Sequence, residues 1–67
     1  METNELLVQA AFDGNLDELT RLLMDGGNVD AEGRYWNALH AAIENGQVSC
    51  VRLLIAHGAN VNQLSRP

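Results

Sequence analysis

Three side chains in the sequence could act as a nucleophile or a general base, namely His40, Cys50 and His57. Cys50 and His57 are seven residues apart, about two helical turns, so one helix cannot bring them together for Cys–His catalysis. No third group that would orient such a pair is identifiable, and the acidic residues are scattered singly. We therefore expect no enzymatic activity and assign His57 to the C-terminal end of a helix, where a cation is favourable.

Cofactor and metal motifs are also missing from the sequence. The one cysteine and two histidines do not cluster at metal-ligand spacing, and Gly26-Gly27 lacks the surroundings of a phosphate-binding loop. We expect neither a metal ion nor a cofactor. A single cysteine permits no internal disulfide and is typical of a reducing compartment, so we expect a cytoplasmic protein.

Composition narrows the choice of partners. The chain has 67 residues, of which 46% are hydrophobic, and its nine acidic residues against four arginines give a net charge of −5. This balance repels phosphate backbones, so we expect no nucleic-acid partner. No apolar run approaches the roughly 18 residues that a membrane span needs, so we expect no membrane association. The length allows one domain at most.

The sequence repeats itself with a period of 32 residues. A shift by this period aligns identical residues without a gap, and apolar residues fall on the same register. The identical pairs are Leu7/Leu39, Ala10/Ala42, Gly14/Gly46, Leu22/Leu54, Gly26/Gly58, Asn28/Asn60 and Val29/Val61.

The second unit has the spacing of a helix hairpin. Asn37 stands where its side-chain oxygen can cap a helix that begins at Ala38, and Gly46 ends that helix. A second helix is predicted over about Val48–His57, with Gly58 as a C′ residue that adopts positive φ at little cost.

The first unit follows the same pattern. It predicts a helix over about Glu5–Asp13, then Gly14, and then a second helix that ends at Asp25 before Gly26. Asn15 would cap the second helix, with Glu18 three residues further on as in a capping box. Such short helices are unstable alone, so the four must stack.

Motifs in both units resemble the ankyrin repeat. The second unit carries Asn37-Ala38-Leu39-His40-Ala41-Ala42 and Gly58-Ala59-Asn60-Val61-Asn62, where the family has Thr-Pro-Leu-His and Gly-Ala-Asp-Val-Asn. The first unit carries Gly14-Asn15-Leu16-Asp17-Glu18-Leu19 and Gly26-Gly27-Asn28-Val29-Asp30, and looks like a degenerate N-terminal repeat.

This resemblance implies an all-α stack of two helix-turn-helix units joined by a loop or β-turn finger. Residues 1–67 would form one domain, with unit one at about 4–31 and unit two at about 32–63. Residues 64–67 would begin a third unit or form a tail. His40 would have a structural role and bridge backbone groups at the start of its helix.

The resemblance further implies binding of a protein partner by the loop tips and the concave side of each first helix. The corresponding positions are Glu32, Gly33, Arg34, Tyr35, Trp36, Ala41, Glu44 and Asn45, with Gln9, Phe12 and Asp13 in unit one. Aromatic and arginine side chains often anchor interfaces, so Arg34-Tyr35-Trp36 is the predicted anchor. The alternative is that Tyr35 and Trp36 cover the small core. Three of the surface residues are acidic, which favours a partner with a basic rim.

The two units differ at positions that would lie on their outer faces. Glu18 and Arg21 stand where unit two has Cys50 and Leu53, so unit one is predicted to be a polar cap. Leu53 would then belong to an uncapped C-terminal face. Because about three repeats are normally needed for stability, we expect an N-terminal fragment of a longer array. The alternative is that this face binds another chain, including a second copy.

Noncovalent protein recognition is therefore the predicted function. Two alternatives remain open at this point. One is a small inhibitory or immunity-type protein that neutralises one enzyme or toxin partner. The other is a purely structural cap that contributes only the start of a solenoid.

Overall fold

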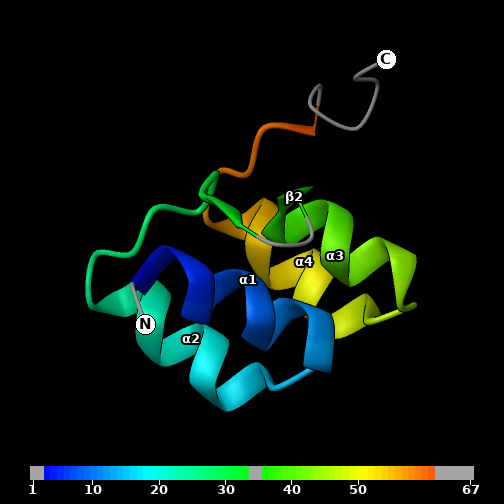
Figure 1. Ribbon diagram of the computed structural model, residues 1–67, viewed down its shortest axis with the longest axis horizontal. Helices are drawn as coiled ribbons and strands as arrows, with labels where there is room; N and C mark the ends of the chain where they lie inside the picture. The colour runs from blue at the N-terminus through cyan, green and yellow to red at the C-terminus, as the bar shows by residue number, and fades with distance from the viewer. Residues whose placement is uncertain (1–2, 34–35, 62–67) are drawn as a thin grey trace.

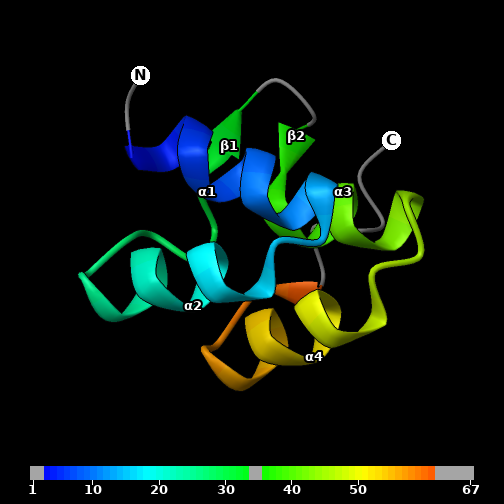
Figure 2. The same ribbon diagram turned by 90° about the horizontal axis from the view of Figure 1, so that it is seen from below.

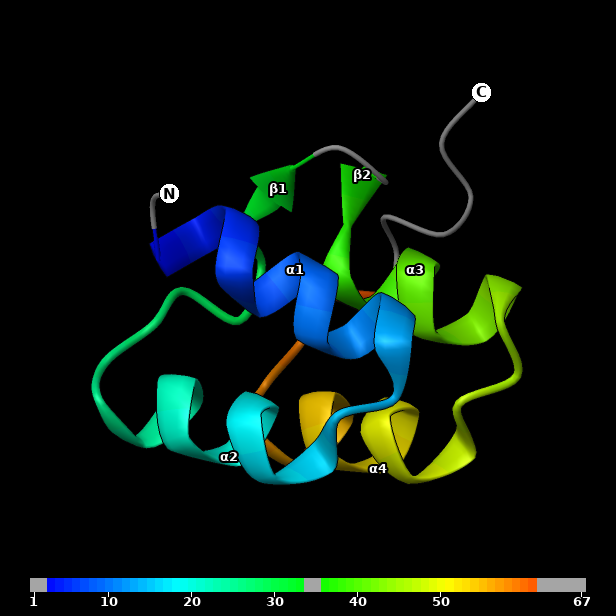
Figure 3. The same cartoon turned by 60° about the horizontal axis from the view of Figure 1, so that its bottom comes forward.

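The computed structural model describes residues 3–33 and 36–61, which form four helices and a short hairpin (Figure 1). In chain order the elements are α1 (Thr3–Asp13), α2 (Leu16–Met24), β1 (Glu32–Gly33), β2 (Trp36–Asn37), α3 (Ala38–Glu44) and α4 (Val48–Ala56). Helices α1 and α3 lie side by side in one layer, and α2 and α4 form a second layer beneath them (Figures 2 and 3). The predicted all-α repeat stack is therefore confirmed.

The connection between the two helix pairs is an antiparallel hairpin, called the finger below. Glu32 pairs with Asn37 and Gly33 with Trp36. It projects from the layer of α1 and α3, on the side away from α2 and α4 (Figure 3). The predicted residues Arg34 and Tyr35 fall outside the described residues, as do residues 62–67 with the expected start of a third unit.

Asparagine side chains cap one helix in each unit. Asn37 Oδ1 accepts the His40 N–H at 2.7 Å at the start of α3, and Asn15 Oδ1 accepts the Glu18 N–H at 3.3 Å at the start of α2. The expected capping box is only half formed, because the Asn15 N–H already donates to Ala10 O at 2.9 Å. The Glu18 carboxylate binds Arg21 instead.

The helices end one residue earlier than predicted at two places, since α2 stops at Met24 and α4 at Ala56, and α1 begins two residues earlier. Every helix then closes with the same backbone pattern. After α3, for example, Gly46 N–H donates to Ile43 O at 3.0 Å and Gln47 N–H to Ala42 O at 2.8 Å. These two hydrogen bonds, together with φ of 67° at Gly46, form a Schellman motif. Gly58, with φ of 90°, has the same place after α4.

Apolar faces of all four helices meet in one core. Leu7, Leu19 and Leu54 are fully buried there, and alanines fill the close approach between α1 and α3. The buried members of the cluster are Leu7, Val8, Ala10, Ala11, Leu19, Leu22, Leu23, Ala38, Leu39, Ala41, Ala42, Cys50 and Leu54. Asn37 is also buried, at 2% exposure, and its side-chain oxygen accepts a hydrogen bond in capping α3.

Side-chain hydrogen bonds also join the two units. Phe12 O, near the end of α1, accepts the Asn45 Nδ2–H at 2.8 Å and the Gln47 Nε2–H at 3.5 Å. Beyond α4, the Asn60 N–H donates to Asp30 Oδ1 at 2.8 Å. Each unit thus supplies groups that complete the backbone hydrogen bonding of the other.

Gly14→Ala is expected to cost more stability than Gly46→Ala, although both glycines have the same place in their units. Both substitutions strain a backbone with positive φ, at 73° and 67°, by about 1–2 kcal/mol. A Cβ at Gly14 would also lie 2.6 Å from Gln47 Cδ, whereas a Cβ at Gly46 meets nothing within 4 Å. We expect a further loss of about 0.5–1 kcal/mol at Gly14 as the Gln47 amide is displaced.

Urea unfolding of the two variants measures this difference. The same pair of substitutions in a Gln47→Ala background is the control, because the difference should vanish there. A difference that persists in that background would contradict the explanation.

Candidate functional site

The predicted binding surface occupies two ends of the α1–α3 layer. The finger lies beside α1 at one end, with Glu32 exposed on β1. The C-terminal ends of α1 and α3 lie side by side at the other end, as the Asn45–Phe12 hydrogen bond shows. The finger and these helix ends therefore border the same layer without forming one cluster (Figure 3).

The helix ends carry two exposed carboxylates, each held by a side chain one turn earlier. Asp13 accepts from Gln9 Nε2 at 3.1 Å, and Glu44 pairs with His40 through Nε2 and Oε2 at 2.7 Å. The sequence analysis did not predict the His40–Glu44 pair, although the i, i+4 spacing of these residues would allow it. The result is a negatively charged end to the layer, with its carboxylates pre-positioned.

Three other residues of the predicted binding surface have structural roles. Ala41 is buried in the core and is not available to a partner, contrary to the prediction. Phe12 is half-buried and packs against the core cluster, and its carbonyl receives the amide of Asn45. Asn45 thus helps to hold α3 against α1. The sequence analysis did not predict that the side-chain amides of Asn45 and Gln47 join the two units, because the acceptor is a backbone carbonyl.

The two end faces of the stack can be identified by comparing equivalent residues. Ala11, Leu19 and Leu23 of unit one are buried, because α3 and α4 cover that side of α1 and α2. Their equivalents in unit two include Ile43 at 46% exposure and Ile55 at 48%. We define the C-terminal end face as the exposed Ile43, Ile55 and Val61, together with Val51, which is half-buried against the core.

The opposite flank shows the reverse pattern. Glu18 and Arg21 are on the outside of unit one, whereas their equivalents in unit two, Cys50 and Leu53, pack into or against the core. Leu53, predicted for the uncapped C-terminal face, is half-buried against the core and is equivalent to Arg21 on the opposite flank, so we do not include it in the C-terminal end face. A period identifies equivalent positions but does not reveal which flank of a unit meets its neighbour.

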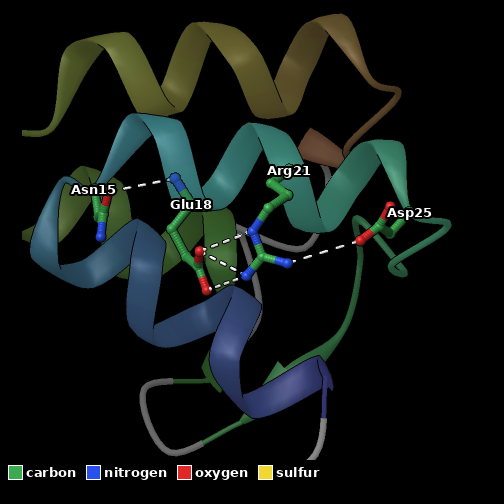
Figure 4. A network of polar contacts seen from close by, with 4 residues as sticks. All are labelled: Asn15, Glu18, Arg21 and Asp25. Carbon is green, nitrogen blue, oxygen red and sulfur yellow. Dashed lines mark hydrogen bonds and ion pairs between the residues drawn. The ribbon is translucent and has the colours of Figure 1, made fainter.

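The N-terminal end face is defined here by Glu18, Arg21 and Asp25, which form a chain of charges along α2 (Figure 4). The Arg21 guanidinium contacts both carboxylate oxygens of Glu18 at 2.6–2.7 Å and approaches Asp25 at 3.8 Å. The hydrogen bond to Glu18 raises the pKa of Arg21. This face is therefore polar where the opposite end face is apolar.

Cys50 and His57, which were considered as catalytic residues, differ in exposure. Cys50 is buried, and burial raises the pKa of its thiol, which keeps it protonated and a poor nucleophile. His57 is exposed as the C-cap of α4. Within residues 3–33 and 36–61, no three metal-ligating side chains gather, and no helix has the length and apolar character to cross a bilayer.

Comparison with known proteins agrees with this architecture. A family model described as ankyrin repeats (3 copies) matches residues 2–65. The chain is 42% identical to human mitochondrial disaggregase over 57 residues, which are 84% of this chain and 8% of that protein. It is 36% identical to human 2-5A-dependent ribonuclease over 62 residues, covering 90% and 8%. It is 43% identical to cortactin-binding protein 2 of Plecturocebus moloch over 60 residues, covering 85% and 4%. The chain thus spans a small part of these relatives, and it belongs to the ankyrin repeat family.

Proposed function

We propose that the chain recognises a protein partner through the finger and the acidic helix ends. Ankyrin repeats generally mediate protein–protein interaction and are typically non-catalytic. The observation that carries the proposal is the arrangement of the α1–α3 layer, which presents the finger with the exposed Glu32 at one end and the exposed carboxylates of Asp13 and Glu44 at the other. Helices α2 and α4 form the opposite layer (Figure 2).

Charge supports a partner with a basic rim. Gln9 and His40 hold the carboxylates of Asp13 and Glu44 in place, so little side-chain entropy remains to be lost on binding. Exposed charges of this kind act mainly on association rate and specificity. The contribution of these carboxylates to partner binding should therefore decrease as salt concentration rises.

Trp36→Ala is expected to weaken partner binding by at least about 1 kcal/mol, roughly fivefold, because aromatic anchors supply a large share of interface energy. The partner would first be captured with the immobilised full chain and identified by mass spectrometry. Its affinity for the variant would then be measured by calorimetry, with far-UV circular dichroism as a check of folding.

Met24→Ala is the matched control, because Met24 is an exposed apolar side chain on α2 in the opposite layer. Its affinity should equal that of the unmodified chain. Equal affinity of the Trp36 variant, or loss of its helical signal without a change in affinity for the folded fraction, would contradict the anchor role.

We further propose that these two units work within a longer repeat array. The relatives are much longer than the matched region, and the apolar C-terminal end face resembles a repeat interface. Stacked repeats gain stability from such interfaces, and about three repeats are normally required.

A further inference from the structure

We infer that Asn45-Gly46 is a site of spontaneous deamidation, at which Asn45 becomes aspartate or isoaspartate, and that the contact between the two units protects this site while the chain is folded. The modification takes water as its co-reactant and releases ammonia. It is a property of the chain alone and goes beyond the proposed partner binding.

The residue that follows Asn45 makes its side chain reactive. Asn45 precedes Gly46, whereas every other asparagine of the sequence precedes a residue with a side chain. Because glycine has no Cβ, its peptide nitrogen is unshielded and its backbone adopts conformations that are closed to other residues. Asn45 is also exposed, at the C-cap of α3. In an unfolded chain this asparagine should therefore be the first to lose its amide.

The reaction is an intramolecular substitution at the Asn45 side chain. The Gly46 peptide nitrogen gives up its proton and bonds to Asn45 Cγ, the bond from Cγ to Nδ2 breaks, and Nδ2 leaves with that proton as ammonia. Water then opens the cyclic imide. Attack of water at Cγ gives aspartate. Attack at the backbone carbonyl carbon gives isoaspartate, in which the main chain runs through Cβ and Cγ.

The folded chain holds each reacting group away from this path. With ψ of 7° at Asn45, the Gly46 nitrogen almost eclipses the backbone nitrogen of Asn45 and is turned away from its side chain. The Gly46 N–H donates to Ile43 O at 3.0 Å, and the departing Nδ2 donates to Phe12 O at 2.8 Å. The reaction therefore requires the end of α3 to open, and its rate should follow the population of that open state.

Deamidation removes a donor from the junction between the units. A carboxylate only accepts hydrogen bonds, so at position 45 it would repel the carbonyl of Phe12 instead of binding it. The new charge would also lie at the C-terminal end of α3, where the helix dipole disfavours an anion, with the carboxylates of Asp13 and Glu44 at the same end of the layer. Gln47 still donates to Phe12 O, so the junction weakens and does not separate.

Unit one shows what a carboxylate at this position needs. Asp13 is the equivalent of Asn45, and it accepts two hydrogen bonds from the amide of Gln9, four residues earlier. The equivalent of Gln9 in unit two is Ala41, which is buried and has no donor in its side chain. A deamidated Asn45 would therefore lack the support that Asp13 has.

Peptide mass spectrometry of the 67-residue chain measures the reaction, because the tryptic fragment 35–52 contains both Asn45 and Asn37. The chain is incubated at mildly alkaline pH, either folded in buffer or unfolded in guanidinium chloride. In the unfolded chain, Asn45 should react much faster than Asn37, and Gly46→Ala should remove most of this difference. Folding should slow the reaction of Asn45 by about tenfold or more. Labelling by an isoaspartate methyltransferase should detect the second product.

Two outcomes would overturn the inference. Equal rates at Asn45 and Asn37 in the unfolded chain would remove the site, and equal rates at Asn45 in the folded and unfolded chains would remove its protection.

Substitutions test whether opening of the fold controls the rate. Leu39 is buried on α3, so Leu39→Ala should destabilise the helix that ends at this site and raise the rate at Asn45 in buffer by about tenfold or more. Leu16→Ala is the matched control, because Leu16 is 39% exposed at the start of α2, and it should raise the rate far less. Equal rates in the two variants would contradict control by opening.

Asn45→Asp tests the consequence of the reaction. It should lower the midpoint of urea unfolding, and by more than Asn45→Ala, which removes the donor without adding a charge. Asn28→Asp is the matched control, because Asn28 uses its side-chain oxygen to accept the Asp30 N–H at 3.0 Å, and a carboxylate can do the same. Equal losses for Asn45→Asp and Asn28→Asp would contradict the loss of the amide contact. The Trp36→Ala experiment depends on none of these results, so the proposed partner site can fail independently.

Discussion

Leu54→Ala should unfold most of the protein at room temperature. Leu54 is fully buried between the two helix layers, and truncation of such a leucine costs about 2–5 kcal/mol through lost transfer energy and a residual cavity. Small domains have only a few kcal/mol of stability to lose. Far-UV circular dichroism should show a loss of helical signal without denaturant, and stabilising osmolyte should restore part of it.

Ile55→Ala is the matched control, because Ile55 is the next residue of α4 and is 48% exposed. We expect the free energy of unfolding to fall by less than about 1 kcal/mol, since much of this side chain already contacts solvent. A loss as large as that of Leu54→Ala would show that Ile55 is covered in solution. It would then contradict the assignment of the C-terminal end face as open in the 67-residue chain.

Asn37→Ala should destabilise the chain by about 1–2 kcal/mol. The Asn37 side chain is buried, and its Oδ1 accepts the His40 N–H at 2.7 Å, so its removal leaves an orphan donor away from water at the start of α3. Chemical denaturation followed by circular dichroism gives the change in unfolding free energy. Asn37→Ser should retain more of it than Asn37→Ala, because the hydroxyl can also accept at an N-cap.

Asn15→Ala is the control for this substitution. Asn15 caps α2 with a longer bond of 3.3 Å and is exposed, so water can replace it. We expect a loss of about 0.5 kcal/mol. If Asn15→Ala cost as much as Asn37→Ala, burial would not be the reason for the larger effect.

Much of the fold could be predicted because its signals are local. The cap at Asn37 needs an oxygen three residues before the N–H of His40, and the Schellman closure at Gly46 needs a residue that tolerates positive φ. Both requirements involve only neighbouring residues. The 32-residue repeat then requires the second helix pair to have the same shape as the first.

The end faces could not be predicted in the same way. Leu53 and Ile55 are both apolar and lie on the same helix, yet Leu53 packs against the core whereas Ile55 is half exposed. Their difference depends on which side of a unit its neighbour occupies. That direction is a property of the three-dimensional stack and is not encoded in hydrophobic spacing.

The candidate site could be predicted only in part, for a different physical reason. The family resemblance places Asn45 and Glu44 on the concave side of unit two, where a partner would bind. Asn45 also donates to a carbonyl of the other unit, and the exposed Glu44 also pairs with His40. A side-chain amide that recognises a backbone group leaves no complementary residue type in the sequence, so pattern analysis does not detect it.

The hydrogen bonds between the units have a consequence for folding speed. They join residues separated by 30, 33 and 35 positions, from Asp30–Asn60 to Phe12–Gln47. If every added unit makes the same bonds, the mean sequence separation of contacts stays constant while the chain grows, and the relative contact order falls. An array built on this plan should thus be able to lengthen without longer loop-closure searches, with each unit adding to a neighbour already in place.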